Sequence, residues 1–301
     1  MSLRLLLPEQ GVTDLLDTWP DEPRVYDRQS RALESRISAR LLFEHMATGC
    51  LPSEEIAVVR APNPSLNAKT YTKEEGRTDA TKLMRLYNGG HTVRVGNLQR
   101  ILPPMARISQ NIQTETGYSN YVHAFMTPSG NQGLRHHWDQ QMAVIVQLAG
   151  VKRWDLWKPP VEAPMREHNE SFRVWCEEYV PQWEAAGPDM RVDLLPGQSL
   201  LLPRGWVHNP YVPEGYESSV HLTFALRERT PLWLAEKLAA GLIQDPKFRR
   251  VLLPTQVGTS ELGEHLRDAR DRMVTYLEDL DTGGLVEAVQ KASRTDLEYS
   301  S

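Results

Sequence analysis

The chain has 301 residues, of which 40% are hydrophobic and 24% charged, and its formal net charge is −5 at neutral pH. This length holds one large domain, or one domain with an appendage, and the composition is ordinary for a globular protein. The slight acidic excess offers no general attraction to phosphates, so we expect no nucleic-acid partner. Cys50 and Cys176 are too few for a disulfide framework or a zinc ribbon. No uncharged run reaches membrane-spanning length, so we expect no membrane association and a cytoplasmic location.

The first 90 residues are predicted to be mixed helix and strand that packs on the core that follows. Residues 38–46 have amphipathic helical spacing, and residues 55–61 form a β-branched run between proline-rich turns, which indicates a strand. Thr78 or Asp79 is expected to cap a helix that ends at the paired glycines 89–90.

Residues 91–228 change to many short strands separated by Gly and Pro turns, with one helical segment at 97–114. This pattern favours a mainly β fold with flanking helices, built on a double-stranded β-helix, the jelly roll of cupins. A charged and aromatic insertion, partly helical, is expected at residues 161–190. The expected strands cover residues 91–95, 121–127, 142–148, 152–157, 192–195, 199–202, 206–211 and 218–226.

Residues 229–301 are predicted to be a helical region. Thr230 and Pro231 suit the cap and first residue of a helix over 231–244. A longer helix from about residue 260 carries apolar residues at steps of three and four, the spacing of two packed helices. This seam either packs on the rest of the chain or forms a homodimer contact, and both interpretations stay open. Its residues are Leu262, Leu266, Ala269, Met273, Tyr276 and Leu280.

The candidate chemistry begins at His137 and Asp139, which leave the same face of an extended strand because one residue separates them. With one distant imidazole they make a two-histidine, one-carboxylate set, which is typical of non-haem Fe(II) oxygenases. Alone, His-x-Asp is as easily an accident in a chain with nine histidines. His208 opens a strand that we expect beside the one carrying His137. His136 is out of register with Asp139 and is predicted not to be a ligand.

Several segments in the right order resemble JmjC-type 2-oxoglutarate oxygenases, and within them the ribosomal oxygenases, which hydroxylate protein side chains. The resemblance covers about residues 90–228 and rests on segments 127–139, 146–154, 195–208 and 219–223. It implies Fe(II), 2-oxoglutarate and O2 as metal, cosubstrate and oxidant. It also implies that His137, Asp139 and His208 are the iron ligands.

The same resemblance assigns cosubstrate contacts. Lys152, fifteen positions after His137, matches the cation that holds the distal carboxylate of 2-oxoglutarate. A buried dicarboxylate needs such a cation and charge-assisted hydrogen bonds. Thr223 matches a position that often supplies a hydroxyl to this carboxylate, and His221 shares its face and is expected to line the pocket.

Two features depart from the family. His123 and Phe125 stand where relatives often place polar cosubstrate contacts, including a tyrosine hydroxyl that Phe125 cannot supply. His123 either replaces the contact or is an ordinary core histidine, and both readings stay open. The ribosomal oxygenases usually continue into a winged-helix domain, whereas this chain stops at Ser301, which weakens the expectation of a ribosomal substrate.

We therefore expect an Fe(II)- and 2-oxoglutarate-dependent hydroxylase of a peptide or protein side chain, acting at a β-carbon. A ribosomally made natural-product precursor peptide is the preferred substrate, and a ribosomal protein is the alternative. Further alternatives are an N-methyl demethylase and a non-catalytic metal-binding cupin. The border of the substrate channel has as candidates Arg135, His136, Trp138 and the insertion around Trp175 and Trp183, although exposed aromatics serve packing as readily.

Overall fold

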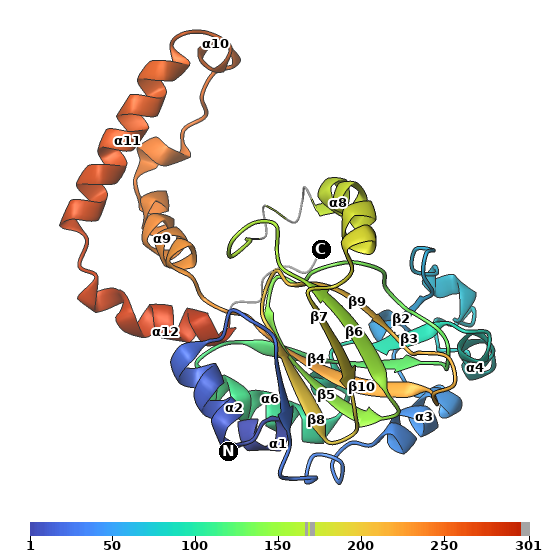
Figure 1. Ribbon diagram of the computed structural model, residues 1–301. Coiled ribbons are helices and arrows are strands. Elements are labelled where there is room, and N and C mark those ends of the chain that lie inside the picture. Colours follow the sequence, from blue (N-terminus) through green and yellow to red (C-terminus); the bar gives the residue numbers. More distant parts are fainter. Residues whose placement is uncertain (166–167, 169–171, 296–301) are drawn as a thin grey trace. The chain divides into compact units, whose positions relative to one another are not determined.

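The computed structural model describes residues 1–165, 168 and 172–295, without the side chains of residues 172–178. Residues 1–227 form one compact unit and residues 228–301 form a second (Figure 1).

Two antiparallel sheets build the first unit, and they confirm the predicted jelly-roll core (Figure 1). The larger sheet has seven strands in the order β1-β8-β5-β10-β4-β3-β2, and the smaller has three in the order β7-β6-β9. The first 90 residues supply both outermost strands of the larger sheet, β1 and β2. Of these, β1 was not predicted, because its mostly exposed side chains give no apolar alternation. The strands are β1 (Arg24–Asp27), β2 (Ile56–Val59), β3 (Thr92–Val95), β4 (Asn120–Thr127), β5 (Met142–Ala149), β6 (Lys152–Trp157), β7 (Met190–Leu194), β8 (Gln198–Leu202), β9 (Val207–Tyr211) and β10 (Ser219–Leu226).

Helices of the first unit flank the strands, and their caps follow the sequence. The Ser38 hydroxyl accepts a hydrogen bond from the Leu41 amide at 3.2 Å, and the Asp79 carboxylate accepts one from the Lys82 amide at 3.0 Å. Asp79 is therefore the cap, while Thr78 donates to the Leu51 carbonyl. These helices and short turns are α1 (Leu3–Leu6), α2 (Glu9–Thr13), η1 (Asp14–Thr18), α3 (Ala39–Thr48), η2 (Ser53–Glu55), η3 (Ala68–Thr70), α4 (Ala80–Asn88), α5 (Leu98–Ile101), α6 (Pro103–Thr116) and α8 (Phe172–Ala186).

The two faces of β4 have different roles. Val122, Ala124 and Met126 are fully buried in the main core, which also contains Ile108 and Ile112 of α6. The alternate residues of β4 point the other way and line a pocket between the sheets. Apolar side chains thus fix the strand under its helix, and the opposite face is left for polar groups.

The second unit is helical, as predicted, and has little core of its own. Thr230 caps α9 by accepting a hydrogen bond from the Trp233 amide at 3.2 Å, and Trp233 is the one buried residue among residues 228–295. Tyr276 links two helices by donating to the Leu238 carbonyl at 3.1 Å. Its elements are α9 (Pro231–Ala239), η4 (Ala240–Gln244), η5 (Pro246–Arg249), α10 (Pro254–Val257), α11 (Leu262–Asp279), η6 (Gly283–Leu285) and α12 (Val286–Thr295).

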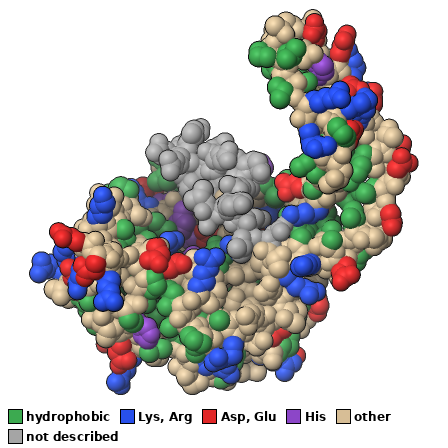
Figure 2. All heavy atoms as spheres, turned by 180° about the vertical axis from the view of Figure 1, so that it is seen from behind, with side chains coloured by type: hydrophobic (Ala, Val, Ile, Leu, Met, Phe, Trp, Pro, Cys, Tyr) green, Lys and Arg blue, Asp and Glu red, His purple; other side chains and the backbone are tan. Residues whose placement is uncertain are grey.

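Large apolar side chains lie at the surface of this second unit, between charged ones (Figure 2). Leu266, the second residue of the predicted seam, is 63% exposed, whereas the other seam residues are half-buried. Val274 and Leu277 of the same helix, which are not in the seam, are also exposed. Within the described ranges, no helix combines the length and apolarity that crossing a bilayer requires.

Candidate metal and cosubstrate site

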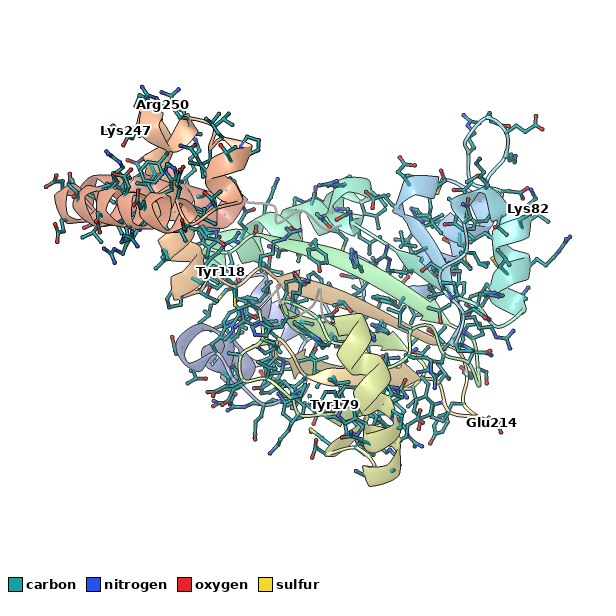
Figure 3. The ribbon with its side chains drawn as sticks, turned by 90° about the horizontal axis from the view of Figure 1, so that it is seen from above. Lys82, Tyr118, Tyr179, Glu214, Lys247 and Arg250 are labelled. Atoms are coloured by element: carbon teal, nitrogen blue, oxygen red, sulfur yellow. The ribbon has the colours of Figure 1, made fainter. Side chains whose placement is uncertain are left out.

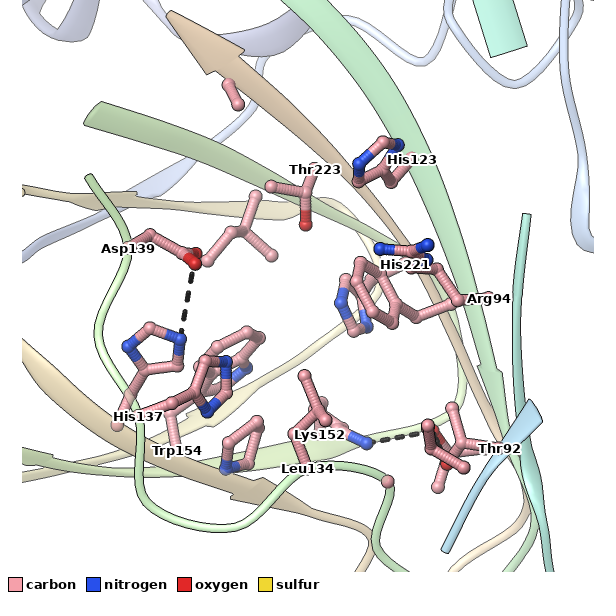
Figure 4. Close-up of a pocket in the computed structure, with 18 of the residues that line it drawn as sticks. Thr92, Arg94, His123, Leu134, His137, Asp139, Lys152, Trp154, His221 and Thr223 are labelled. Atoms are coloured by element: carbon pink, nitrogen blue, oxygen red, sulfur yellow. Dashed lines mark hydrogen bonds and ion pairs between the residues drawn. The ribbon is translucent and has the colours of Figure 1, made fainter. Parts of the chain in front are cut away.

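Three ligand-type side chains meet between the two sheets. The donor atoms of His137, Asp139 and His208 all lie within 4.8 Å of one another (Figure 4). The backbones of His137 and His208 pair directly, with the His137 amide 3.1 Å from the His208 carbonyl and the reverse bond at 2.7 Å. The pairing places the distant histidine beside the His-x-Asp segment, as the sequence suggested.

Both imidazoles are held in the tautomer that a metal ligand needs. Nδ1 of His137 lies 2.6 Å from the Arg135 carbonyl, and Nδ1 of His208 lies 2.9 Å from the Trp206 carbonyl. A carbonyl only accepts, so each Nδ1 carries the proton and each Nε2 keeps a free lone pair. Burial, together with His137, lowers the pKa of His208 to about 4, so this ring is neutral at neutral pH. The residues fit a divalent metal held on one face, with open positions opposite.

His136 lies outside this cluster and serves packing. Its ring centroid is 4.8 Å from that of Trp157, and it stacks on Trp183 of α8 at 6.1 Å. Tyr179, labelled in Figure 3, stacks in turn on Trp183, with ring centroids 5.9 Å apart. The position agrees with the prediction that His136 is not a ligand, whereas the side chain of Trp175 lies outside the described residues.

Lys152 provides a buried cation at another part of the same pocket (Figure 4). Its Nζ lies 2.9 Å from the Thr127 hydroxyl, which in turn is 3.0 Å from the Thr92 hydroxyl. The residue is 2% exposed and forms no ion pair with any described residue. Burial lowers the pKa of Lys152 to about 7. A buried ammonium without a counterion is costly, so this end of the pocket is suited to a carboxylate.

The strand register determines which groups lie near Lys152. On β4 and β10, Thr127 is opposite Ser219, and His123 is opposite Thr223. Four residues of β10 separate these two levels, about 13 Å along the strand. The hydroxyl beside Lys152 therefore belongs to Thr127, which the sequence did not single out, and Thr223 lines the pocket further along.

His221 occupies the level between them, opposite Phe125. The two rings stack with centroids 4.9 Å apart and an interplanar angle of 13°. Burial, with the charge of Lys152, lowers the pKa of His221 well below its usual value, and its buried Nδ1 has no hydrogen-bond partner among the described residues. At the position where the resemblance led us to expect a tyrosine, Phe125 thus presents a stacking face, and the neutral imidazole of His221 is the neighbouring polar group.

His123 and Arg94 complete the polar wall. Nδ1 of His123 accepts a hydrogen bond from the Asn97 amide at 3.2 Å, and burial lowers the pKa of His123 to about 4. Arg94 on β3 pairs with Phe125 and lines the same pocket. The sequence reading missed Arg94, although a lone arginine between the buried Val93 and Val95 was a usable signal.

Comparison with known proteins finds similarity to the family that the sequence segments resemble. Residues 95–232 match the family model described as "JmjC domain". The protein named bifunctional lysine-specific demethylase and histidyl-hydroxylase NO66 of Drosophila pseudoobscura pseudoobscura is 26% identical over 252 residues, 80% of this chain and 24% of that protein. Ribosomal oxygenase 2 of Rattus norvegicus is 26% identical over 226 residues, 73% of this chain and 46% of that protein. The chain thus matches less than half the length of either relative.

Solved structures show the same fold. The ribosomal oxygenase YcfD of Escherichia coli, in complex with cobalt and succinic acid, superposes with a TM-score of 0.54 at 16% identity. The match covers 92% of this chain and 68% of that one.

Proposed function

We propose, because residues 95–232 match the JmjC domain, that this protein is an Fe(II)- and 2-oxoglutarate-dependent hydroxylase of protein side chains. One observation carries the proposal. The pocket that contains the His137, Asp139 and His208 cluster also contains Lys152, a cation with no ion pair to any residue that the structure describes, so a metal and a dicarboxylate can be held together.

Different residues of the pocket would bind the metal and the cosubstrate. His137, Asp139 and His208 would hold the iron, and Lys152 with the Thr127 hydroxyl would hold the distal carboxylate of 2-oxoglutarate. The bound iron, with 2-oxoglutarate and O2, supplies the oxidation of an unactivated C–H bond. One oxygen atom enters that bond and the other enters succinate, as 2-oxoglutarate loses CO2.

Other residues of the pocket orient the reactants. Trp154 lies between two of the imidazoles, with ring centroids 5.8 Å from His208 and 5.5 Å from His221. This ring packs against both histidines and would help to exclude water from the pocket once metal and cosubstrate are bound. His221 is placed to hydrogen-bond the carboxylate that Lys152 neutralises, and Thr223 would contact the reactants nearer His123.

The substrate proposed is a side chain of a ribosomal protein, hydroxylated at a β-carbon. The names of the relatives support this alternative better than a natural-product precursor peptide, which was the preferred reading of the sequence. The unpaired Lys152 argues against a non-catalytic cupin. The cytoplasmic location stays a prediction.

The test couples metal binding to cosubstrate turnover. Purified protein with Fe(II), ascorbate and 2-oxoglutarate is expected to form succinate, and ribosomal proteins treated with it should gain one oxygen in mass spectrometry. Asp139→Ala is expected to weaken metal binding by about 100-fold or more, beyond the 10–100-fold typical of outer contacts, and to abolish succinate formation. The adjacent His136→Ala is the matched control and should keep both properties. Metal binding that survives Asp139→Ala would contradict the proposal.

We also propose that the second unit mediates a homodimer. Trp233, the single buried residue among its described residues 228–295, cannot supply a core for this number of residues. Leu266, Val274 and Leu277 expose apolar surface on one helix. Sedimentation velocity should show a dimer for the full chain and a monomer for Leu266→Glu/Leu277→Glu. A monomeric wild-type protein at micromolar concentration would refute this assembly.

A further inference from the structure

The pocket contains a second cation that the reaction's metal and cosubstrate do not account for. Arg94 reaches the pocket from β3, at the level of Phe125 and His221. Figure 4 shows Arg94 and His123 on one side of the pocket and Lys152 beside Thr92 on another. After burial, Arg94 is the next cause that lowers the pKa of His123, and Lys152 is the next cause for His221, so the two cations lie near different histidines.

Among the described residues, Arg94 has no ion-pair partner. Its Nε is buried without a hydrogen bond, and the side chain forms no ion pair within the described part of the chain. Glu55, in the turn before β2, accepts a hydrogen bond from the Asn97 side chain at 2.9 Å instead. A partly buried guanidinium in this state favours an acceptor with two oxygens, which a carboxylate provides in bidentate geometry.

His123 adds a hydrogen-bond donor, its Nε2–H group, because Nδ1 is already engaged as an acceptor. The Asn97 amide can only donate, so Nδ1 of His123 is the acceptor and the proton of the neutral ring is on Nε2. The ring is held further by Tyr121, whose centroid is 4.6 Å away. This wall of the pocket therefore offers donors from both Arg94 and His123.

The summed charge of the pocket residues, Fe(II) and 2-oxoglutarate is +1. Three lining residues are charged, namely Arg94, Lys152 and Asp139. Fe(II) and the two carboxylates of 2-oxoglutarate cancel each other, and Lys152 and Asp139 cancel each other, which leaves Arg94. Arg227, whose guanidinium lies 4.8 Å from the centre of the Tyr121 ring, adds positive potential at this end. A basic substrate side chain would be repelled there, and an acidic one would be attracted.

We propose that Arg94 and His123 bind the carboxylate of the residue to be hydroxylated, so that the substrate side chain is acidic. This inference rests on the proposed function, because it assumes that metal and 2-oxoglutarate fill the other part of the pocket. It assigns Arg94 and His123 to substrate specificity and Lys152 to the cosubstrate.

The experiment measures binding without turnover. Full-length protein is loaded with Mn(II) and N-oxalylglycine, an unreactive analogue of 2-oxoglutarate. Pentapeptides with four glycines around a central aspartate, glutamate, asparagine, histidine or arginine are added at millimolar concentration. Paramagnetic relaxation of their protons by Mn(II) reports binding beside the metal, and the two acidic peptides should show the strongest enhancement.

Substitutions then distinguish the role of Arg94 in peptide binding from that of Lys152 in cosubstrate binding. Arg94→Met is expected to weaken binding of the aspartate peptide about 10- to 100-fold, the effect of losing a charge-assisted hydrogen bond, and to leave N-oxalylglycine affinity nearly unchanged. Arg94→Lys should restore part of the binding, and Arg94→Glu should shift the preference to the arginine peptide. Arg100→Met removes the same charge from an exposed position outside the pocket and is the matched control.

The outcomes distinguish this inference from the proposed function. Failure of Mn(II) or N-oxalylglycine to bind would refute the proposed function itself. If both bind but the acidic peptides show no preference, or keep it in Arg94→Met, then the carboxylate subsite is wrong. Loss of N-oxalylglycine affinity in Arg94→Met would instead assign Arg94 to the cosubstrate and would also overturn the inference.

Discussion

The two units of this chain differ in how far they bury their apolar side chains. In residues 1–227, the strands bury one apolar face under helices and keep the other face for a polar pocket. In residues 228–295, Trp233 alone is buried, and apolar residues such as Leu266 and Val251 remain exposed. The first unit has a core that can support strained or charged groups at a site. The second has exposed apolar surface and little core, which favours a role in subunit association over a role in catalysis.

The largest effect is expected when the two units are produced as separate fragments and their unfolding is compared. A fragment of residues 1–227 is expected to unfold cooperatively and to bind metal, whereas residues 228–301 alone should lack a cooperative transition, because one buried residue cannot offset chain entropy. Circular dichroism melting of both fragments checks this. A cooperative melt of the isolated second unit would show that its helices are self-sufficient.

Paired leucine truncations sharpen the contrast at single residues. Leu222→Ala, at a fully buried position of β10, should lower the free energy of unfolding by about 2–5 kcal/mol. Leu266→Ala, at the 63% exposed position of α11, should change the stability of the monomer by less than about 0.5 kcal/mol. Urea titrations at low protein concentration compare the two. Similar losses in both variants would mean that the second unit is packed in solution.

The polar pocket should also make the first unit sensitive to acid. The pKa of His123 is about 4 in the folded protein, below the ordinary value of 6.5, so between these values the unfolded chain binds more protons. Stability from this group is complete above pH 6.5 and falls as the pH falls, by about 2 kcal/mol at pH 5. Urea unfolding of metal-free protein at pH 7 and pH 5 should show the loss.

Two variants assign that loss to the pocket. His123→Gln should reduce the difference between the two pH values, because glutamine has no proton to take up. His45→Gln, at a half-exposed histidine of α3, should keep it. An unchanged pH dependence in His123→Gln would place the acid sensitivity elsewhere.

The smallest effect expected concerns the cosubstrate cation. Burial holds the pKa of Lys152 near 7, and a bound carboxylate favours its charged form. Affinity for N-oxalylglycine should therefore fall above pH 7, by up to about tenfold per pH unit. Isothermal titration calorimetry from pH 6.5 to 8.5 should show this slope, and Lys152→Arg should flatten it. A wild-type affinity independent of pH would mean that Lys152 is not the anchor.

Sequence alone determined much of the framework, because local signals encode it. Short runs between Gly and Pro turns predicted β4 and β10, Asp79 and Thr230 marked helix starts, and the spacing of His137 and Asp139 with His208 indicated an iron site. These features depend on neighbours in the chain, where period and turn chemistry act directly.

Only the tertiary structure decided which distant groups meet. The register of β4 on β10 placed Thr127, rather than Thr223, beside Lys152, and the register of β3 on β4 brought Arg94 to the pocket. Pairing partners and strand register depend on contacts between remote segments, so a sequence read along its length does not contain them explicitly. For the same reason, the helical seam was visible in the sequence, but the exposure of Leu266 within it was not.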